Sequence, residues 1–180
     1  TVDGGIVAFF SLEMSADQLA TRIVAEQSGI SSYKIRQGRI TEAEFARLTD
    51  VAAQIEKLPL YIDQTGGISI AQLTARARRL KRQKGLDVLV IDLVDVGSRY
   101  YTFQATMLYA MQVAFAKDVA VMILDRPNPL GGLLVEGPML LPEWSSFVGV
   151  HPIPIRHGLT IGELAILYKE ELELDGELEI

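Results

Sequence analysis

Side chains that could do chemistry gather in a loop-rich stretch of the second half of the chain. This stretch runs roughly from 126 to 158 and is rich in proline and glycine. With Asp125, which directly precedes it, the stretch contains the candidate ligand-binding and catalytic residues: Asp125, Arg126, Asn128, Glu136, Arg156 and His157. Carboxylates and histidine transfer protons to and from reacting groups, and arginine binds anionic groups. A connection of this length is typical of a functional loop or of irregular structure.

Each of these residues also has a purely structural interpretation. Asp125 can cap a turn, and Asn128, which lies between two prolines, suits a turn. Glu136 can be a solvated loop residue. His157 precedes Gly158 and can hydrogen-bond to the backbone. Both interpretations stay open, and we favour the structural interpretation over a catalytic role.

Two carboxylates in the first half follow apolar segments. Glu13 comes shortly after the segment 6–10, and Asp92 comes directly after the segment 88–91. Phosphoryl transfer also needs a glycine-rich loop that cradles the phosphates and a lysine that neutralises their charge. No G-x-x-x-x-G-K-S/T sequence occurs in the 180 residues. We therefore expect solvated strand-end carboxylates, very weak ATP binding, and neither a metal nor a cofactor.

Strand and helix signals alternate along the chain. Apolar segments predict strands at 6–10, 60–62, 88–91, 119–124 and 178–180. Capping boxes, in which Gln or Glu follows the cap three residues later, predict helix starts at Ser15, Thr41, Ser69 and Thr160. A further helix is predicted at 102–117. The sequence thus predicts an α/β fold, a three-layer sandwich with a mainly parallel sheet, Rossmann-like or P-loop-like, in a single domain.

One predicted helix is strongly basic. Its cations are Arg76, Arg78, Arg79, Lys81, Arg82 and Lys84. The net charge of the chain is -6, which gives no general attraction to nucleic acid. We favour a solvated helix face, and weak, non-specific, salt-sensitive nucleic-acid binding is the alternative.

Composition limits the compartment and the chemistry. Hydrophobic residues make up 49% of the chain, which is typical of a soluble globular domain. No apolar run reaches the ~18 residues that a membrane span needs. The chain has no cysteine, which excludes disulfides and thiolate chemistry. No signal-like segment opens the sequence, so the compartment is unassigned, with the cytoplasm as the default.

The first half resembles a family of motor ATPases. The segments VAFFSLEMS and LPLYIDQTGG, the basic helix and the strand that ends at Asp92 are similar to the RecA-like domain of DnaB-type replicative helicases, over 6–92. The resemblance implies that Glu13 polarises the attacking water and that Asp92 helps to hold Mg²⁺. The phosphate loop, DNA-binding loop and arginine finger of that family are missing from the 180 residues, so we expect both carboxylates to be vestigial.

The second half resembles a family of cell-wall glycosidases. The segments DVGSRYYT, LDRPNPLGG, VEGP and PIRHGLTIGELA are similar to exo-β-N-acetylmuramidases of the NamZ type, over about 87–180. The resemblance implies a cleft that includes the candidate ligand-binding residues named above, with Glu136 as a catalytic carboxylate. Glycoside hydrolysis usually needs two carboxyl groups. The other glutamate of the family belongs to a Glu-His-Gly motif that this sequence lacks, so we expect no catalysis.

The two resemblances meet in the strand 87–92. Natural fusions usually join whole domains through linkers, whereas this junction lies inside a strand. We therefore predict one hybrid domain, 1–92 helicase-like and 93–180 muramidase-like, in an engineered chimera with no activity and no specific partner. The alternatives are a residual muramidase or sugar-binding module, and a weak nucleotide- or DNA-binding remnant. Strand order stays open, as does a homodimer through an unpaired sheet edge.

Overall fold

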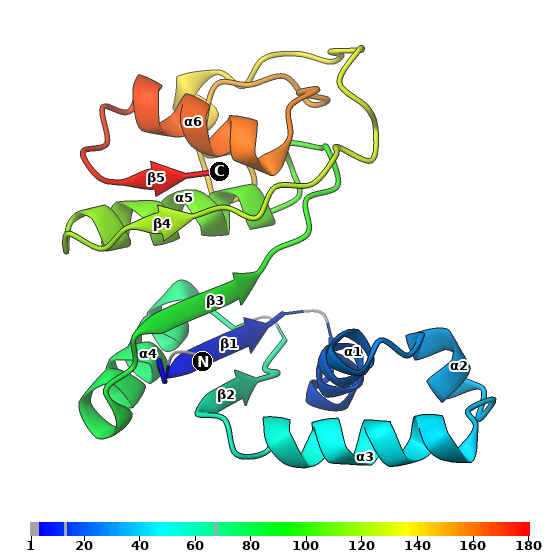
Figure 1. Cartoon of the computed structure of the whole chain (residues 1–180). Helices are drawn as coiled ribbons and strands as arrows, with labels where there is room; N and C mark the ends of the chain where they lie inside the picture. The colour runs from blue at the N-terminus through cyan, green and yellow to red at the C-terminus, as the bar shows by residue number, and fades with distance from the viewer. Residues whose placement is uncertain (1–3, 13, 67) are drawn as a thin grey trace. The chain divides into compact units, whose positions relative to one another are not determined.

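The computed structural model describes residues 4–12, 14–66 and 68–180, and these residues form two compact units (Figure 1). Unit 1 ends at Asp92 and unit 2 begins at Leu93. The boundary therefore falls directly after the strand in which the two sequence resemblances meet. Each unit has its own sheet and its own hydrophobic core.

Unit 1 is built on a three-stranded parallel sheet with the order β2-β1-β3. The central strand is β1 (Val7–Ser11), and its neighbours are β2 (Leu60–Asp63) and β3 (Val88–Asp92). Val7 is in register with Leu60 on one side and with Val88 on the other. Parallel strands need long crossover connections, and the helices of unit 1 provide them.

The helices of unit 1 are α1 (Ala16–Ser28), α2 (Ser32–Arg36), α3 (Glu42–Ile55) and α4 (Ile70–Lys84). The three capping boxes predicted in this unit, at Ser15, Thr41 and Ser69, are all formed. Helix α4 packs on the sheet through Leu73, Ala77 and Leu80, which meet Ala8 and Phe10 in the core. The short helix α2 was not predicted, because it has only five residues and no side-chain cap.

Unit 2 packs α5 (Phe103–Phe115) and α6 (Ile161–Glu171) with a two-stranded parallel sheet of β4 (Val121–Met122) and β5 (Leu178–Glu179). The capping box of α6 at Thr160 is formed as predicted. The core consists of Met107, Leu108, Met111, Phe115, Ile153, Ile161, Leu164, Ala165 and Tyr168. The long connection between β4 and α6 contains one 3-10 turn, η1 (Pro142–Trp144).

The predicted α/β class with parallel strand pairing is confirmed in both units. Two strands differ from their prediction. Val88 and Leu89 are 48% and 40% exposed, although an all-apolar strand predicts burial on both faces, because β3 is an edge strand of its sheet. The strand predicted at 119–124 forms only at Val121–Met122. Within the described residues, no helix is both long and apolar enough to cross a membrane.

Candidate functional site

Asp125 joins the start of the long connection to its end. Its Oδ2 accepts a hydrogen bond from the Thr160 hydroxyl at 2.7 Å, and its Oδ1 accepts one from the Gly162 amide at 2.9 Å. Burial opposes ionisation, but these hydrogen bonds and one from the backbone of Arg126 outweigh it and lower the pKa of Asp125. Both carboxylate oxygens are therefore engaged at the N-terminus of α6.

Asn128 holds a turn in the same connection. Its Nδ2 donates to the Leu159 carbonyl at 2.8 Å, and its Oδ1 accepts from the Leu130 amide at 2.8 Å. The second bond is an Asx turn, which suits an asparagine between two prolines. Gly97 has a φ of +80° and lies directly against the Asn128 carboxamide. Both polar atoms of Asn128 are thus used within the protein.

Glu136 and Arg156 pair through both their backbones and their side chains. The Glu136 amide donates to the Arg156 carbonyl at 3.1 Å, and the Arg156 amide donates back at 2.9 Å. The Arg156 guanidinium donates to Glu136 Oε2 at 2.6 Å and also to the Leu130 carbonyl. The Glu136 side chain is 60% exposed. The candidate catalytic carboxylate is therefore the surface partner of an arginine.

His157 faces a buried carboxylate, Asp95. The His157 Nε2 and Asp95 Oδ2 atoms are 3.7 Å apart, and the two side chains are 0% and 6% exposed. The Leu159 amide donates to His157 Nδ1 at 3.2 Å, which assigns the proton of the neutral ring to Nε2. Burial lowers the pKa of His157, although the Asp95 carboxylate opposes this shift. Asp95 was missed from the sequence, although it opens the DVGSRYYT segment that carries the family resemblance.

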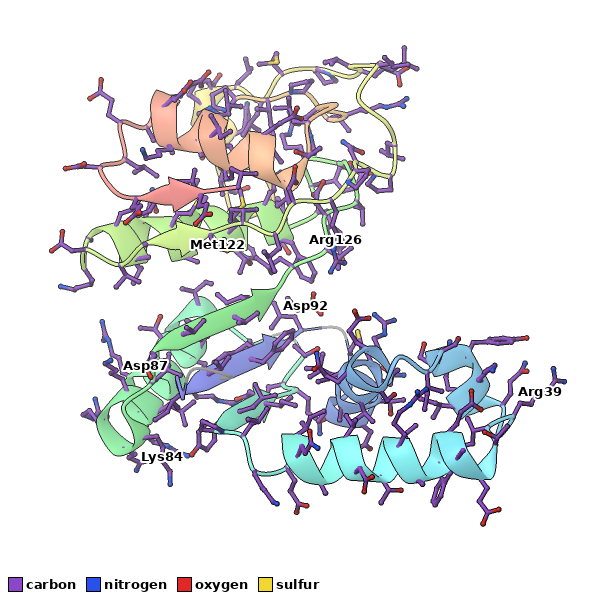
Figure 2. The ribbon with its side chains drawn as sticks, in the orientation of Figure 1. Arg39, Lys84, Asp87, Asp92, Met122 and Arg126 are labelled. Atoms are coloured by element: carbon purple, nitrogen blue, oxygen red, sulfur yellow. The ribbon has the colours of Figure 1, made fainter. Side chains whose placement is uncertain are left out.

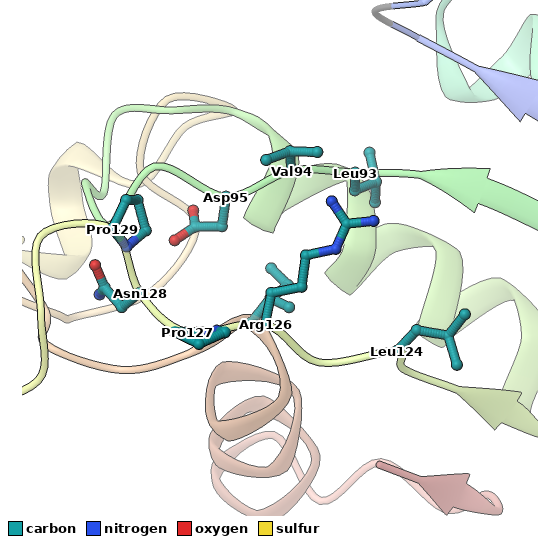
Figure 3. Close-up of a pocket in the computed structure, with 9 residues that line it drawn as sticks. Leu93, Val94, Asp95, Leu124, Arg126, Pro127, Asn128 and Pro129 are labelled. Atoms are coloured by element: carbon teal, nitrogen blue, oxygen red, sulfur yellow. The ribbon is translucent and has the colours of Figure 1, made fainter. Parts of the chain in front are cut away.

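A small cavity of about 130 Å³ lies beside Asp95 in unit 2 (Figure 3). Its apolar walls come from Leu93, Val94, Leu124, Pro127, Pro129 and Ile161. Its polar lining residues are Asp95, Arg126 and Asn128. Figure 3 shows the Arg126 guanidinium reaching toward Leu93 and Val94. Two of the six predicted ligand-binding or catalytic residues of this unit, Arg126 and Asn128, thus line the cavity.

One of the two candidate carboxylates of unit 1 lies at the end of a strand. Glu13 falls outside the described residues. Asp92 ends β3 and is in register with Ser11, whose hydroxyl is fully buried and has no hydrogen-bond partner among the described residues. Asp63 ends β2 and forms an ion pair with Arg76. Across the residues described, no three acidic, histidine or cysteine side chains are grouped as metal ligands.

The basic helix α4 uses two of its six cations within unit 1. Besides the ion pair with Asp63, the Lys81 ammonium donates to the Leu86 carbonyl at 2.7 Å. Figure 2 shows Lys84 at the end of α4, directed away from the sheet. The remaining cations are exposed and have no ion pair with the described residues: Arg78, Arg79, Arg82 and Lys84.

The parallel pairing of the strands and the helices that connect them place the chain in the α/β class of proteins. The chain belongs to the NamZ_N family, "Exo-beta-N-acetylmuramidase NamZ, N-terminal", whose model matches residues 25–180. It is similar to the peptidoglycan beta-N-acetylmuramidase NamZ of Bacillus subtilis, with 45% identity over 122 residues, 67% of this chain and 30% of the relative. A solved DUF1343-family protein from Bacteroides fragilis gives a TM-score of 0.55 at 26% identity, over 98% of this chain and 44% of that chain.

The helicase resemblance is confirmed as well. The replicative DNA helicase DnaB of Rickettsia bellii is 41% identical over 90 residues, 50% of this chain and 18% of the helicase. A solved ATPase domain gives a TM-score of 0.53 at 19% identity, over 66% of this chain and 45% of that one, which shows a shared fold. The chain therefore combines NamZ-like and DnaB-like sequence. The NamZ match begins at residue 25, well before the predicted start near 87.

Proposed function

We propose that unit 2 binds glycans that end in N-acetylmuramic acid, and that this 180-residue chain does not hydrolyse them. The observation that carries the proposal is that hydrogen bonds hold the long connection between β4 and α6 in place. Asp125 fastens it to Gly162 of α6, and Asn128 and Arg156 fasten it internally, by hydrogen bonds to Leu159 and Glu136. A loop that is ordered before binding loses less conformational entropy when it binds a ligand. Membership of the NamZ_N family supports a glycan of the bacterial cell wall as that ligand.

The proposed lack of hydrolysis rests on the state of Glu136, Asp125 and Asp95. Glu136 is ion-paired with Arg156, and Asp125 is engaged by Thr160 and Gly162. Asp95 is buried beside His157. Hydrolysis of a glycosidic bond usually needs two carboxyl groups that flank it. Neither Asp125 nor Asp95 is therefore free to act across a sugar from Glu136.

A chromogenic N-acetylmuramic acid glycoside tests both parts of the proposal. We expect the glycoside to bind, with a Kd in the millimolar range (~1 mM), which is ordinary for one sugar at a small site. We expect its hydrolysis to be no faster with the wild-type chain than with the Glu136→Gln variant. The Bacillus subtilis relative serves as the positive control. Faster release by the wild type would contradict the lack of catalysis, and the absence of binding would contradict the proposed glycan binding.

A second function is favoured by the four exposed cations of α4. We propose weak, non-specific binding of single-stranded DNA, with affinity falling about 50-fold from about 50 mM to about 200 mM salt, as four phosphate contacts predict. The replacement of Arg78, Arg79, Arg82 and Lys84 by glutamine should abolish binding in fluorescence anisotropy. A control with the same change of charge replaces Arg36, Arg39, Arg47 and Lys57, which are also exposed. Equal losses in both variants would show that only net charge matters.

We also propose that the chain is an engineered chimera. The support is that it combines the sequences of two families without a linker, with the boundary of the two units directly after β3. A gene in a natural genome that encodes both parts in one reading frame would overturn this origin.

A further inference from the structure

The cavity of unit 2 is too small for a whole sugar. Its volume is about 130 Å³. An apolar protein cavity of about 150 Å³ holds one benzene molecule, which has six non-hydrogen atoms. A pyranose ring with its acetamido group has many more atoms than this. The cavity therefore fits a substituent of a sugar and not the ring itself.

The lining of the cavity combines apolar walls with one cation. Leu93, Val94 and Ile161 contribute aliphatic side chains, and Arg126 is the cation. The Arg126 guanidinium makes no hydrogen bond or ion pair with the described part of the chain, and Figure 3 shows it next to Leu93 and Val94. An unoccupied guanidinium beside an apolar wall matches a short carboxylate that carries an alkyl group, because its two N–H groups can bind both oxygens.

The other two polar residues of the cavity offer few free hydrogen-bonding groups to a neutral ligand. Both polar atoms of the Asn128 side chain are hydrogen-bonded within the connection. Asp95 Oδ2 accepts from the Gly97 amide at 2.7 Å, and its Oδ1 is buried from solvent without a partner among the described residues. The negative charge of Asp95 repels an anion, so an anionic ligand depends on Arg126. Arg126 is thus the polar group through which a ligand gains affinity.

We infer that this cavity binds the lactyl carboxylate of N-acetylmuramic acid. Arg126 pairs with the carboxylate, and Val94 and Ile161 contact the methyl group. The lactyl ether has about six non-hydrogen atoms, which is the size that the cavity accepts. This inference rests on the proposed function. It adds the structural basis of specificity for the sugar, because the lactyl group is what distinguishes N-acetylmuramic acid from N-acetylglucosamine.

The test compares the methyl β-glycosides of the two sugars by isothermal titration calorimetry. The wild type should bind the muramic acid glycoside at least about tenfold more tightly, the size expected for one charge-assisted pair. Arg126→Gln should remove this preference. Val94→Phe should also remove it, because the ring fills the cavity while Arg126 stays. Lys117→Gln removes an exposed cation at the end of α5 and should leave the preference unchanged.

Each outcome separates the inference from the proposed function. Equal affinity of the wild type for both glycosides would overturn the inference and leave sugar binding intact. D-Lactate alone, added at millimolar concentration, should shift the methyl NMR signals of Leu93, Val94 and Ile161 in the wild type but not in Arg126→Gln. Lactate binding without glycoside binding would overturn the proposed function and leave a carboxylate site. If neither glycoside nor D-lactate binds, both the inference and the proposed function are overturned.

Discussion

Replacing Gly97 with alanine is expected to lower the free energy of unfolding of unit 2 by about 2–4 kcal/mol. The φ of +80° at this position disfavours any residue with a Cβ atom, at a cost of about 1 kcal/mol. A Cβ atom would also lie 3.0 Å from Cγ of Asn128 and closer still to its Oδ1. The carboxamide must therefore move, which breaks its hydrogen bonds to Leu159 and Leu130. Because Asn128 lines the cavity, glycan binding should be lost as well.

Gly131 provides the matched control for this prediction. Its φ is +77°, but no atom lies within 4 Å of a Cβ placed there, so Gly131→Ala bears only the backbone cost of about 1 kcal/mol. Urea denaturation measures both variants. In an Asn128→Ala background, the cost of Gly97→Ala should fall to that of Gly131→Ala. Equal costs of the two glycine replacements in the wild-type background would contradict the packing of Gly97 against Asn128.

Local signals made the regular elements predictable from the sequence. Each capping box joins residues three positions apart, such as Ser69 and Gln72, and needs nothing from the rest of the fold. The glycines Gly29 and Gly85 end their helices in the left-handed conformation for the same local reason. Helix α5 was predicted over 102–117, and it forms without a side-chain cap.

The contacts of the candidate site could not be predicted in this way. Asp125 reaches Thr160 and Gly162, and Arg156 reaches Glu136, across a connection that has no periodic pattern. The motifs of the NamZ family indicate which residues gather in the connection. They do not indicate which side chains are already hydrogen-bonded within the protein. The structure shows that those of Asp125 and Asn128 are. Asp95 was missed because only the three-dimensional path of the chain brings it to His157.

The exposure of β3 has a similar cause. An apolar strand is buried on both faces only when other elements cover it, and sequence cannot tell how many neighbours a strand has. Val88 and Leu89 have the side chains of a central strand, but β3 pairs with β1 alone among the described strands. The unpaired edges of β2 and β3 are the parts of unit 1 to which our hypothesis of a homodimer would apply.

As the pH falls from about 7.5 to about 5.5, unfolding of unit 2 is expected to become easier, and His157 is expected to cause this change. Burial lowers the pKa of His157 below its usual value. As the pH falls through about 6.5, the unfolded chain therefore binds a proton that the folded chain does not. Stability is fully present above that pH and is lost toward the pKa of the folded state, with a slope of at most about 1.4 kcal/mol per pH unit.

His157→Gln should flatten the pH dependence of the unfolding free energy. The carboxylates with lowered pKa values, such as Asp63 and Asp125, titrate below this window. The Asp95 carboxylate raises the pKa of His157, so Asp95→Asn should move the NMR titration of His157 to still lower pH. An unchanged pH dependence in His157→Gln would assign the acid sensitivity to other groups and would contradict the buried neutral histidine.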